Sequence, residues 1–344
     1  MIVNATIVLG IFFASPASAA QTLPLVTRDG MTLSGVIERP ASALKAIALL
    51  LPGSGNVGLD GDVSSPFVGT GYQGQKAALS EQLAQTLAEK GVATFRYAKR
   101  GFETPSELPH QTFDYLLRDA EDALAMLRTR EAGVPVYVVG FSEGALLAVH
   151  LAARVPVDKL FLLALPTRPI DELLDYQFME WPVGLVSTRL DLNRDGIVDP
   201  SEQPEGAVYP IAGAPLLAAD ANGDHSLSLS EEVVPFFRTV YQQIRGMLAD
   251  PNLLAWYNAM KALPSFDSIA TQVSAPVYLY QGTADPQVNS QWPLVDSRFF
   301  SGLKGLRLFS GLGHGFAPLQ GLFGEAKTSG PFSSVLLDSL AEDI

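Results

Sequence analysis

The chain has 344 residues, of which 47% are hydrophobic and 17% are charged. That apolar content supports a large buried core and excludes a disordered chain, and the length fits one large α/β domain with an insertion, or two domains. The formal net charge of −13 excludes nucleic acid and anionic membranes as the expected partners. Cysteine is absent, so no disulfide contributes to the fold.

The first twenty residues have the pattern of a secretory signal. An apolar core, Ile7 to Phe13, is followed by the A-x-A cleavage pattern Ala17-Ser18-Ala19. The apolar run is too short to cross a bilayer, and a lipid-facing anchor or a buried first strand is the alternative. We predict a signal peptide over residues 1–20, cleaved after Ala19 or Ala20, and an exported protein in the periplasm or outside the cell. No other stretch is long and apolar enough for stable membrane insertion.

Strand and helix signals then alternate along the chain. Residues 23–40 predict a hairpin, because the Asp29-Gly30 pair between two short apolar runs is a turn signal. Helical patterns follow at Ser80–Glu89, closed by Gly91, and at Asp114–Arg130. Apolar runs predict strands within six segments: 47–51, 92–102, 134–139, 158–166, 275–285 and 305–315. A helix-like or loop segment at 292–300 separates the last two of them. This alternation predicts a mostly parallel sheet with helices on both faces.

The stretch from Val134 to Arg154 organises the chain. Its β-branched run ends in Gly-Phe-Ser-Glu-Gly and passes directly into an Ala/Leu-rich helical pattern, the strand, turn and helix of a nucleophile elbow. Such a turn lifts the Ser142 hydroxyl clear of the sheet, beside free N–H groups at the start of a helix. Gly140 and Gly144 are small because strand and helix pack closely around a strained turn. We therefore predict Ser142 as a catalytic nucleophile.

An antiparallel start, βα units and a nucleophile after a central strand together resemble the α/β-hydrolase fold, in which the acid and then the histidine follow the nucleophile in the chain. Of the four histidines, only His314 follows the last predicted strand, in the segment "GLGHGF". Asp285 ends the strand segment "VYLYQGTAD", whereas the rivals Asp267 and Asp296 do not directly end a strand. The resemblance thus implies the triad Ser142, Asp285 and His314, with Asp285 orienting the imidazole.

Two further motifs resemble those of secreted bacterial esterases and serine-peptidase-like hydrolases. "LPGSGNVGLDGD" resembles their Gly-Ser-Gly loop, with Pro52 where a histidine is often found, and "RYAKRG" resembles their "RYDKRG" turn, with Ala98 in place of Asp. The resemblance implies an oxyanion hole made by the backbone N–H groups of Ser54, or its neighbour Gly55, and Glu143. The Glu143 carboxylate either caps the helix or binds a substrate amine.

Residues 167–272 do not fit the alternation and predict an inserted cap between core segments 21–166 and 273–344. Asp171 to Asp250 contains 14 Asp and Glu against 4 Lys and Arg, so this stretch carries −10 of the net charge of −13. The acidity lies partly in two stretches with the spacing of EF-hand calcium loops, 191–202 and 220–231. The predicted Ca²⁺ ligands are Asp191, Asn193, Asp195, the Ile197 carbonyl, Asp199 and Glu202 in the first loop, and Asp220, Asn222, Asp224, Ser226, Ser228 and Glu231 in the second.

The second loop has His225 where the first has Gly196, a position that needs a sharp bend, so a weaker site is expected there. The alternative for both loops is an acidic, solvated surface. We expect one or two structural Ca²⁺ ions, which would fold the cap by offsetting carboxylate repulsion, and no organic cofactor.

These features favour an exported serine hydrolase that cleaves carboxylic esters of small molecules. An aminopeptidase-like activity on short peptides is the first alternative. A calcium-dependent binding protein on an inactive hydrolase scaffold is the second, because fold alone does not determine function. Aromatic residues of the cap either line an acyl pocket or form the cap's own core: Trp181, Phe236, Phe237, Trp256 and Tyr257.

Overall fold

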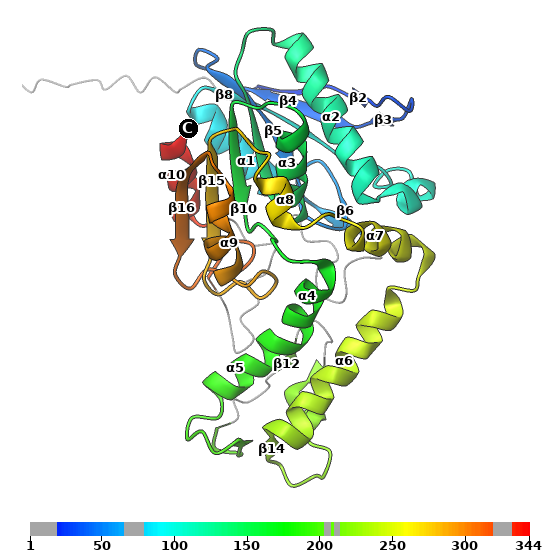
Figure 1. Ribbon diagram of the computed structural model, residues 1–344, viewed down its shortest axis with the longest axis vertical. Coiled ribbons are helices and arrows are strands. Elements are labelled where there is room, and N and C mark those ends of the chain that lie inside the picture. Colours follow the sequence, from blue (N-terminus) through cyan, green and yellow to red (C-terminus); the bar gives the residue numbers. More distant parts are fainter. Residues whose placement is uncertain (1–18, 65–78, 203–207, 210–213, 319–331) are drawn as a thin grey trace, which may run out of the picture.

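The computed structural model describes residues 19–64, 79–202, 208–209, 214–318 and 332–344, and its centre is one eight-stranded sheet (Figure 1). The strand order is β1-β4-β8-β5-β9-β10-β15-β16, and only the β1–β4 and β4–β8 pairs are antiparallel. The predicted mostly parallel sheet is therefore confirmed. The strands are β1 (Ala19–Thr22), β4 (Gly35–Arg39), β5 (Ala46–Leu51), β8 (Val92–Tyr97), β9 (Val136–Phe141), β10 (Lys159–Leu163), β15 (Val277–Gly282) and β16 (Leu303–Phe309).

Helices cover both faces of this sheet because its central strands are apolar on both sides. In β10, Leu160 and Leu162 belong to one buried cluster, and Phe161 and Leu163 belong to the other. The first cluster includes buried residues of α2 (Phe113–Arg130), α3 (Glu143–Arg154) and α8 (Phe266–Ala270). The second includes buried residues of α1 (Leu79–Glu89) and α10 (Ser334–Asp343). Two packed layers of helix thus hold the sheet, and the carboxyl ends of its parallel strands share one edge.

Two glycines, Gly30 and Gly91, form the turns that the sequence predicts at their positions. The short strands β2 (Leu25–Val26) and β3 (Thr32–Leu33) pair as the predicted hairpin, with Gly30 at φ 85°. Gly91, at φ 84°, follows α1 as expected for a residue that ends a helix. Smaller elements complete the core: β6 (Asn56–Val57), β7 (Val63–Ser64), η1 (Pro105–His110), α9 (Gln291–Asp296) and η5 (Ser297–Phe299).

The predicted signal peptide lies almost wholly outside the described residues, which begin at Ala19. Ala19 and Ala20 are the first residues of β1 and pair with Arg39 and Glu38 of β4. Cleavage after Ala20 would leave Gln21 and Thr22 to pair with β4. Among the helices that the structure describes, none is long and apolar enough to cross a membrane.

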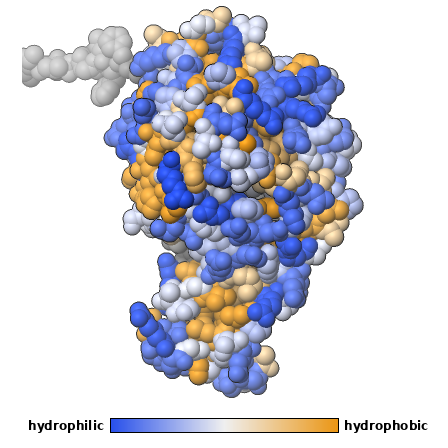
Figure 2. All heavy atoms as spheres, in the orientation of Figure 1, coloured by the Kyte–Doolittle hydropathy of each residue, from blue (hydrophilic) through white to orange (hydrophobic). Residues whose placement is uncertain are grey.

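The insertion between β10 and β15 projects from the core (Figure 1). Its projecting part has its own small core, which contains Val186, Leu216, Leu227 and Phe237. Apolar residues show on the surface of the cap as well as on the main body (Figure 2), and Leu192 and Leu217 are exposed there. The projecting elements are α4 (Ile170–Asp175), η2 (Tyr176–Glu180), α5 (Trp181–Arg189), β11 (Ile197–Val198), β12 (Val208–Tyr209), β13 (Ala214–Pro215), η3 (Leu216–Ala219), β14 (Leu227–Ser228), η4 (Leu229–Val233) and α6 (Val234–Met247).

The last two helices of the predicted cap lie on the core instead of projecting with the rest. Helix α7 (Pro251–Lys261) contacts η1 and α2, and α8 contacts α3. The base of the projecting part is fixed by Asp171 of α4, which accepts hydrogen bonds from Tyr257 and Arg245 and lies 3.2 Å from Lys261. The Tyr257 hydroxyl, together with the two cations, lowers the pKa of Asp171 to about 2.

Pro235 does not break the helix that follows the second acidic loop. Helix α6 begins at Val234, so Pro235 occupies the first turn, where its missing N–H costs no helical hydrogen bond. The π-type turn η4 comes before it and changes the register of the loop, as described below.

Candidate functional site

The predicted nucleophile lies at a strained turn between β9 and α3. Ser142 has φ 54° and ψ −121°, a conformation that residues with a Cβ seldom adopt. Its backbone N–H donates to Leu163 of β10 at 2.9 Å, which fixes the turn to the neighbouring strand. A Cβ on Gly144 would lie 2.1 Å from the Leu51 carbonyl oxygen, and one on Gly140 would lie 2.3 Å from the Gly144 oxygen. Both glycines are therefore required for the close packing around Ser142.

Asp285 and His314, 29 positions apart, form a buried pair beyond the ends of β15 and β16. His314 Nδ1 lies 2.9 Å from Asp285 Oδ2 and 3.1 Å from Oδ1. The Asp285 side chain is fully buried. Its Oδ1 accepts the backbone N–H groups of Gln287 at 2.7 Å and Val288 at 2.9 Å, and its Oδ2 accepts Gln281 Nε2 at 2.9 Å. Three donors thus hold the carboxylate in one orientation toward the imidazole.

The imidazole lies beside the elbow. The ring of Phe141, the residue before Ser142, is 5.1 Å from the His314 ring, centroid to centroid. Because Nδ1 faces Asp285, Nε2 is the ring nitrogen left to exchange a proton with a substrate or a hydroxyl. A serine on a strained turn, an imidazole beside it and a buried carboxylate that contacts the imidazole are the components of nucleophilic acyl transfer.

The rival acids and histidines serve other contacts. Buried Asp296 accepts hydrogen bonds from Thr167, at 2.6 Å, and from Arg168, whereas Asp267 is exposed on α8. His150 is buried against Phe113, and burial lowers its pKa to about 4, so it is a neutral core residue. The other two histidines, His110 and His225, have exposed side chains.

The predicted oxyanion loop adjoins Ser142. A Cβ on Gly53 would lie 3.4 Å from the Ser142 Cβ, so the Gly53–Ser54 peptide is next to the nucleophile. Glu143 is 4% exposed, and its carboxylate accepts Lys99 Nζ at 2.7 Å and the indole N–H of Trp256 at 2.5 Å. Each oxygen of the buried carboxylate thus already accepts a hydrogen bond, and this pairing does not favour amine binding, the alternative to helix capping for Glu143.

Cap residues that the sequence did not single out also reach the site. The Tyr176 hydroxyl donates to the Asp285 carbonyl oxygen at 3.0 Å, and Gln177 Nε2 donates to the Gln287 carbonyl oxygen at 3.0 Å. Burial and the nearby Asp285 charge raise the pKa of Tyr176, so it remains a protonated donor. Trp256, expected either in an acyl pocket or in the cap core, instead lies on α7 and donates a hydrogen bond to Glu143 of the elbow. Of the remaining aromatic candidates, Phe237 is in the core of the cap, with Trp181 and Phe236 packed against it.

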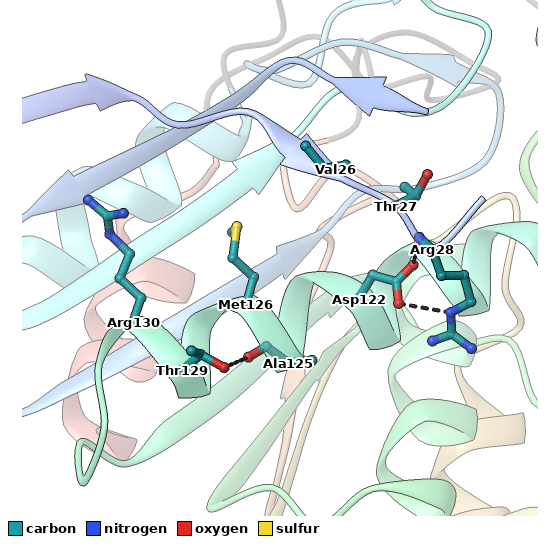
Figure 3. Close-up of a pocket in the computed structure, with 8 residues that line it drawn as sticks. All are labelled: Val26, Thr27, Arg28, Asp122, Ala125, Met126, Thr129 and Arg130. Atoms are coloured by element: carbon teal, nitrogen blue, oxygen red, sulfur yellow. Dashed lines mark hydrogen bonds and ion pairs between the residues drawn. The ribbon is translucent and has the colours of Figure 1, made fainter. Parts of the chain in front are cut away.

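An open surface pocket of about 600 Å³ lies elsewhere, between the end of β2 and one side of α2 (Figure 3). An ion pair between Arg28 and Asp122, with Nε and Oδ1 2.8 Å apart, crosses part of its wall. None of its lining residues is a predicted site residue: Val26, Thr27, Arg28, Asp122, Ala125, Met126, Thr129 and Arg130.

The two acidic loops of the cap have matching backbones. Gly196 and His225, the sixth residues, have φ 84° and 66°, so His225 does take the left-handed conformation that the glycine takes. Arg194 and Gly223, the fourth residues, have φ 62° and 78°. Their eighth residues pair directly, Val198 with Leu227, in the two-stranded sheet of β11 and β14. The acidic side chains mostly accept backbone N–H groups of their own loop, for example Asp191 Oδ1 from Asp195 at 3.1 Å.

The residue that closes the second loop differs from the prediction. In the first loop, Glu202 accepts the N–H groups of Leu192 and Asn193 and that of Asp199. In the second, Glu232 makes the equivalent contacts to Ala221, Asn222 and Ser228. Glu231, the predicted ligand, is exposed, because η4 adds one residue before the helix. In the described part of the chain, no three acidic or histidine side chains lie close enough together to hold a metal ion, so the calcium sites stay a prediction.

Comparison with known proteins agrees with the architecture. The family model described as "Serine aminopeptidase, S33" matches residues 71–316. Esterase EstD of Thermotoga maritima is 33% identical over 98 residues, which are 28% of this chain and 24% of that protein. The aligned part thus spans only about a quarter of that relative's length.

Solved structures show the same fold at low identity. The esterase Pf2001 of Pyrococcus furiosus superposes with a TM-score of 0.52 at 13% identity, covering 99% of this chain and 96% of that chain. Est1E from Butyrivibrio proteoclasticus gives a TM-score of 0.51 at 13% identity, covering 94% and 96%. The predicted α/β-hydrolase fold is confirmed. Within that fold class, the chain belongs to the serine aminopeptidase S33 family.

Proposed function

We propose that the protein is a serine hydrolase that cleaves carboxylic esters of small molecules through an acyl-enzyme on Ser142. The observation that carries the proposal is the buried Asp285–His314 pair beside a strained serine turn. The Ser142 oxygen attacks the acyl carbon while His314 Nε2 takes its proton, and the carbonyl oxygen becomes an anion facing the elbow N–H groups. The alcohol then leaves with the proton from His314. Water, deprotonated by the same imidazole, releases the acid and restores Ser142.

Two observations favour esters over amides. The Glu143 carboxylate, the group next to Ser142 that could bind a free amine, is already paired with Lys99 and Trp256. The named relatives with a resembling sequence or fold are esterases. The family description, serine aminopeptidase, keeps amide hydrolysis as the second candidate.

A fluorophosphonate probe with peptide mapping tests the proposal. We expect the probe to modify Ser142 in the wild-type protein and to leave Ser142→Ala unmodified. Matched p-nitrophenyl esters and p-nitroanilides of the same acyl group should then show faster turnover of the ester. Faster anilide turnover would favour the aminopeptidase. Absence of labelling on folded protein would favour a calcium-dependent binding protein on an inactive scaffold.

We also propose that the protein is exported and that the loops at 191–202 and 220–232 bind structural Ca²⁺. Support comes from the spacing of oxygen side chains, the matched left-handed residues and the direct pairing of the two loops. The carboxylate oxygens of these loops are the type of ligand that Ca²⁺, a hard cation, prefers. Extracellular calcium modules bind at about 10⁻⁴–10⁻³ M, a range that suits an exported protein. The intact mass of the exported protein tests cleavage after Ala19 or Ala20.

Removal of calcium with EGTA is expected to lower the melting temperature, and CaCl₂ but not MgCl₂ should restore it, since the loop offers more oxygen ligands than Mg²⁺ accepts. The variants Glu202→Gln and Glu232→Gln should each weaken this response. Glu231→Gln is the matched control, because Glu231 is exposed and should leave the response intact. An unchanged melting temperature in EGTA would contradict the calcium proposal.

A further inference from the structure

One buried ammonium group connects both parts of the expected oxyanion hole. Lys99 follows β8 and has a side chain only 4% exposed. Its Nζ donates to the Gly53 carbonyl oxygen at 2.6 Å and to Glu143 Oε2 at 2.7 Å. Gly53 precedes Ser54, and Glu143 follows Ser142, so Lys99 contacts the two segments whose N–H groups would face the substrate oxygen.

The contact with Gly53 determines the direction of the next N–H group. The Gly53 carbonyl and the Ser54 N–H belong to one planar trans peptide, in which the two bonds point in opposite directions. A cation that holds the carbonyl on one side therefore directs the Ser54 N–H to the other side. The positive charge also polarises the peptide, which strengthens the N–H as a donor to an anion.

The contact with Glu143 ties the same cation to the elbow and to the cap. The Glu143 carboxylate offers Oε2 to Lys99 and Oε1 to Trp256 of α7. A buried carboxylate and ammonium stabilise each other only when paired, so neither group can move alone without a large cost. The oxyanion loop, the start of α3 and the cap helix α7 are thereby held in one arrangement.

We propose that Lys99 is a positioning residue for the oxyanion hole, acting through the Gly53–Ser54 peptide and through Glu143. It touches no substrate. Its effect is to pre-orient the donors toward the charge that develops on the carbonyl oxygen, which contributes to the transition state and not to substrate binding. This inference rests on the proposed acyl-enzyme mechanism.

The test compares Lys99→Met with the double variant Lys99→Met/Glu143→Gln, which removes the unpaired buried charge. Both variants should lower kcat for an ester by about 10- to 100-fold, with KM little changed. The expected loss is smaller than the roughly 10²- to 10³-fold drop in kcat on removal of a complete oxyanion-hole donor, because here the donor stays and only its orientation is disturbed. Affinity for an alkyl trifluoromethyl ketone should fall in parallel. That ketone adds the Ser142 oxygen to its carbonyl carbon, passes the serine proton to His314 and leaves an oxyanion. The double variant should recover melting temperature without recovering kcat.

Arg96→Met is the matched control. Arg96 is a buried cation of β8 that pairs with Glu38 at 3.1 Å and Asp60 at 3.2 Å. Its loss should lower the melting temperature and leave kcat and ketone affinity unchanged. Recovery of kcat in the double variant, or ketone affinity that does not follow kcat, would overturn the role of Lys99 while Ser142 labelling persists. Absence of Ser142 labelling in the wild type would overturn the proposed function and this inference together.

Discussion

Asp285→Asn is expected to lower kcat for ester hydrolysis by about 10⁴-fold with little change in the fold. The reason lies in how the carboxylate is held. Its Oδ1 accepts two backbone N–H groups, from Gln287 and Val288, so an asparagine would keep its oxygen there. The amide nitrogen would then face His314 and donate to Nδ1. That forces the imidazole proton onto Nε2, the nitrogen that must accept the Ser142 proton.

Asp296→Asn is the matched control for this substitution. Asp296 is also a buried aspartate beyond β15, but it pairs with Thr167 and Arg168. Its neutralisation should lower the melting temperature and leave kcat unchanged. Measurement of kcat and of thermal unfolding for both variants separates the two roles. Equal losses of kcat would contradict the assignment of Asp285 as the acid.

Gly144→Ala is expected to reduce the free energy of unfolding by about 3 kcal/mol or more and to reduce ester hydrolysis in the protein that still folds. The added Cβ would meet the Leu51 carbonyl oxygen at 2.1 Å and the Pro52 oxygen at 2.5 Å. These are backbone atoms at the end of β5, which cannot rotate away as a side chain can. Relief of the clash must therefore move either Ser142 or the oxyanion loop that begins there.

Gly184→Ala provides the comparison, because Gly184 lies inside helix α5 and a Cβ there meets nothing within 4 Å. This change should stabilise the protein by up to about 1 kcal/mol, the helix preference of alanine over glycine. Urea unfolding of both variants gives the free energies. A tolerated alanine at position 144 would show that the elbow is less tightly packed than the structure indicates.

The sequence predicts the elements that depend on local pattern. The elbow, the hairpin at Gly30 and the helix over 114–130 each follow from spacing, turn residues and apolar periodicity, and each is present. Asp285 and His314 were predicted from chain order in a resembling fold, and the structure brings them within hydrogen-bond distance. The parallel sheet follows from the alternation of strands and helices.

Contacts between distant segments could not be predicted. Tyr176 and Asp285 are 109 positions apart, and Trp256 and Glu143 are 113 apart, so their meeting depends on how the cap docks. The contact of Lys99 with Gly53 could not be predicted either, because no local pattern indicates that the Lys99 ammonium donates to the Gly53 carbonyl oxygen. The role of Glu232 was missed because a one-residue π-type insertion is invisible to a spacing rule.

The place where the cap enters the chain has a consequence for folding. Strands β10 and β15 are hydrogen-bonded neighbours, yet the whole segment from Ala164 to Pro276 separates them in sequence. Their pairing must close that long loop, which slows the assembly of this half of the sheet relative to the hairpin at the amino end. Closure entropy grows only logarithmically, by about 0.6 kcal/mol for each doubling of length. An insertion at this position can therefore lengthen or shorten during evolution at little cost in stability, while the sheet and its edge are retained.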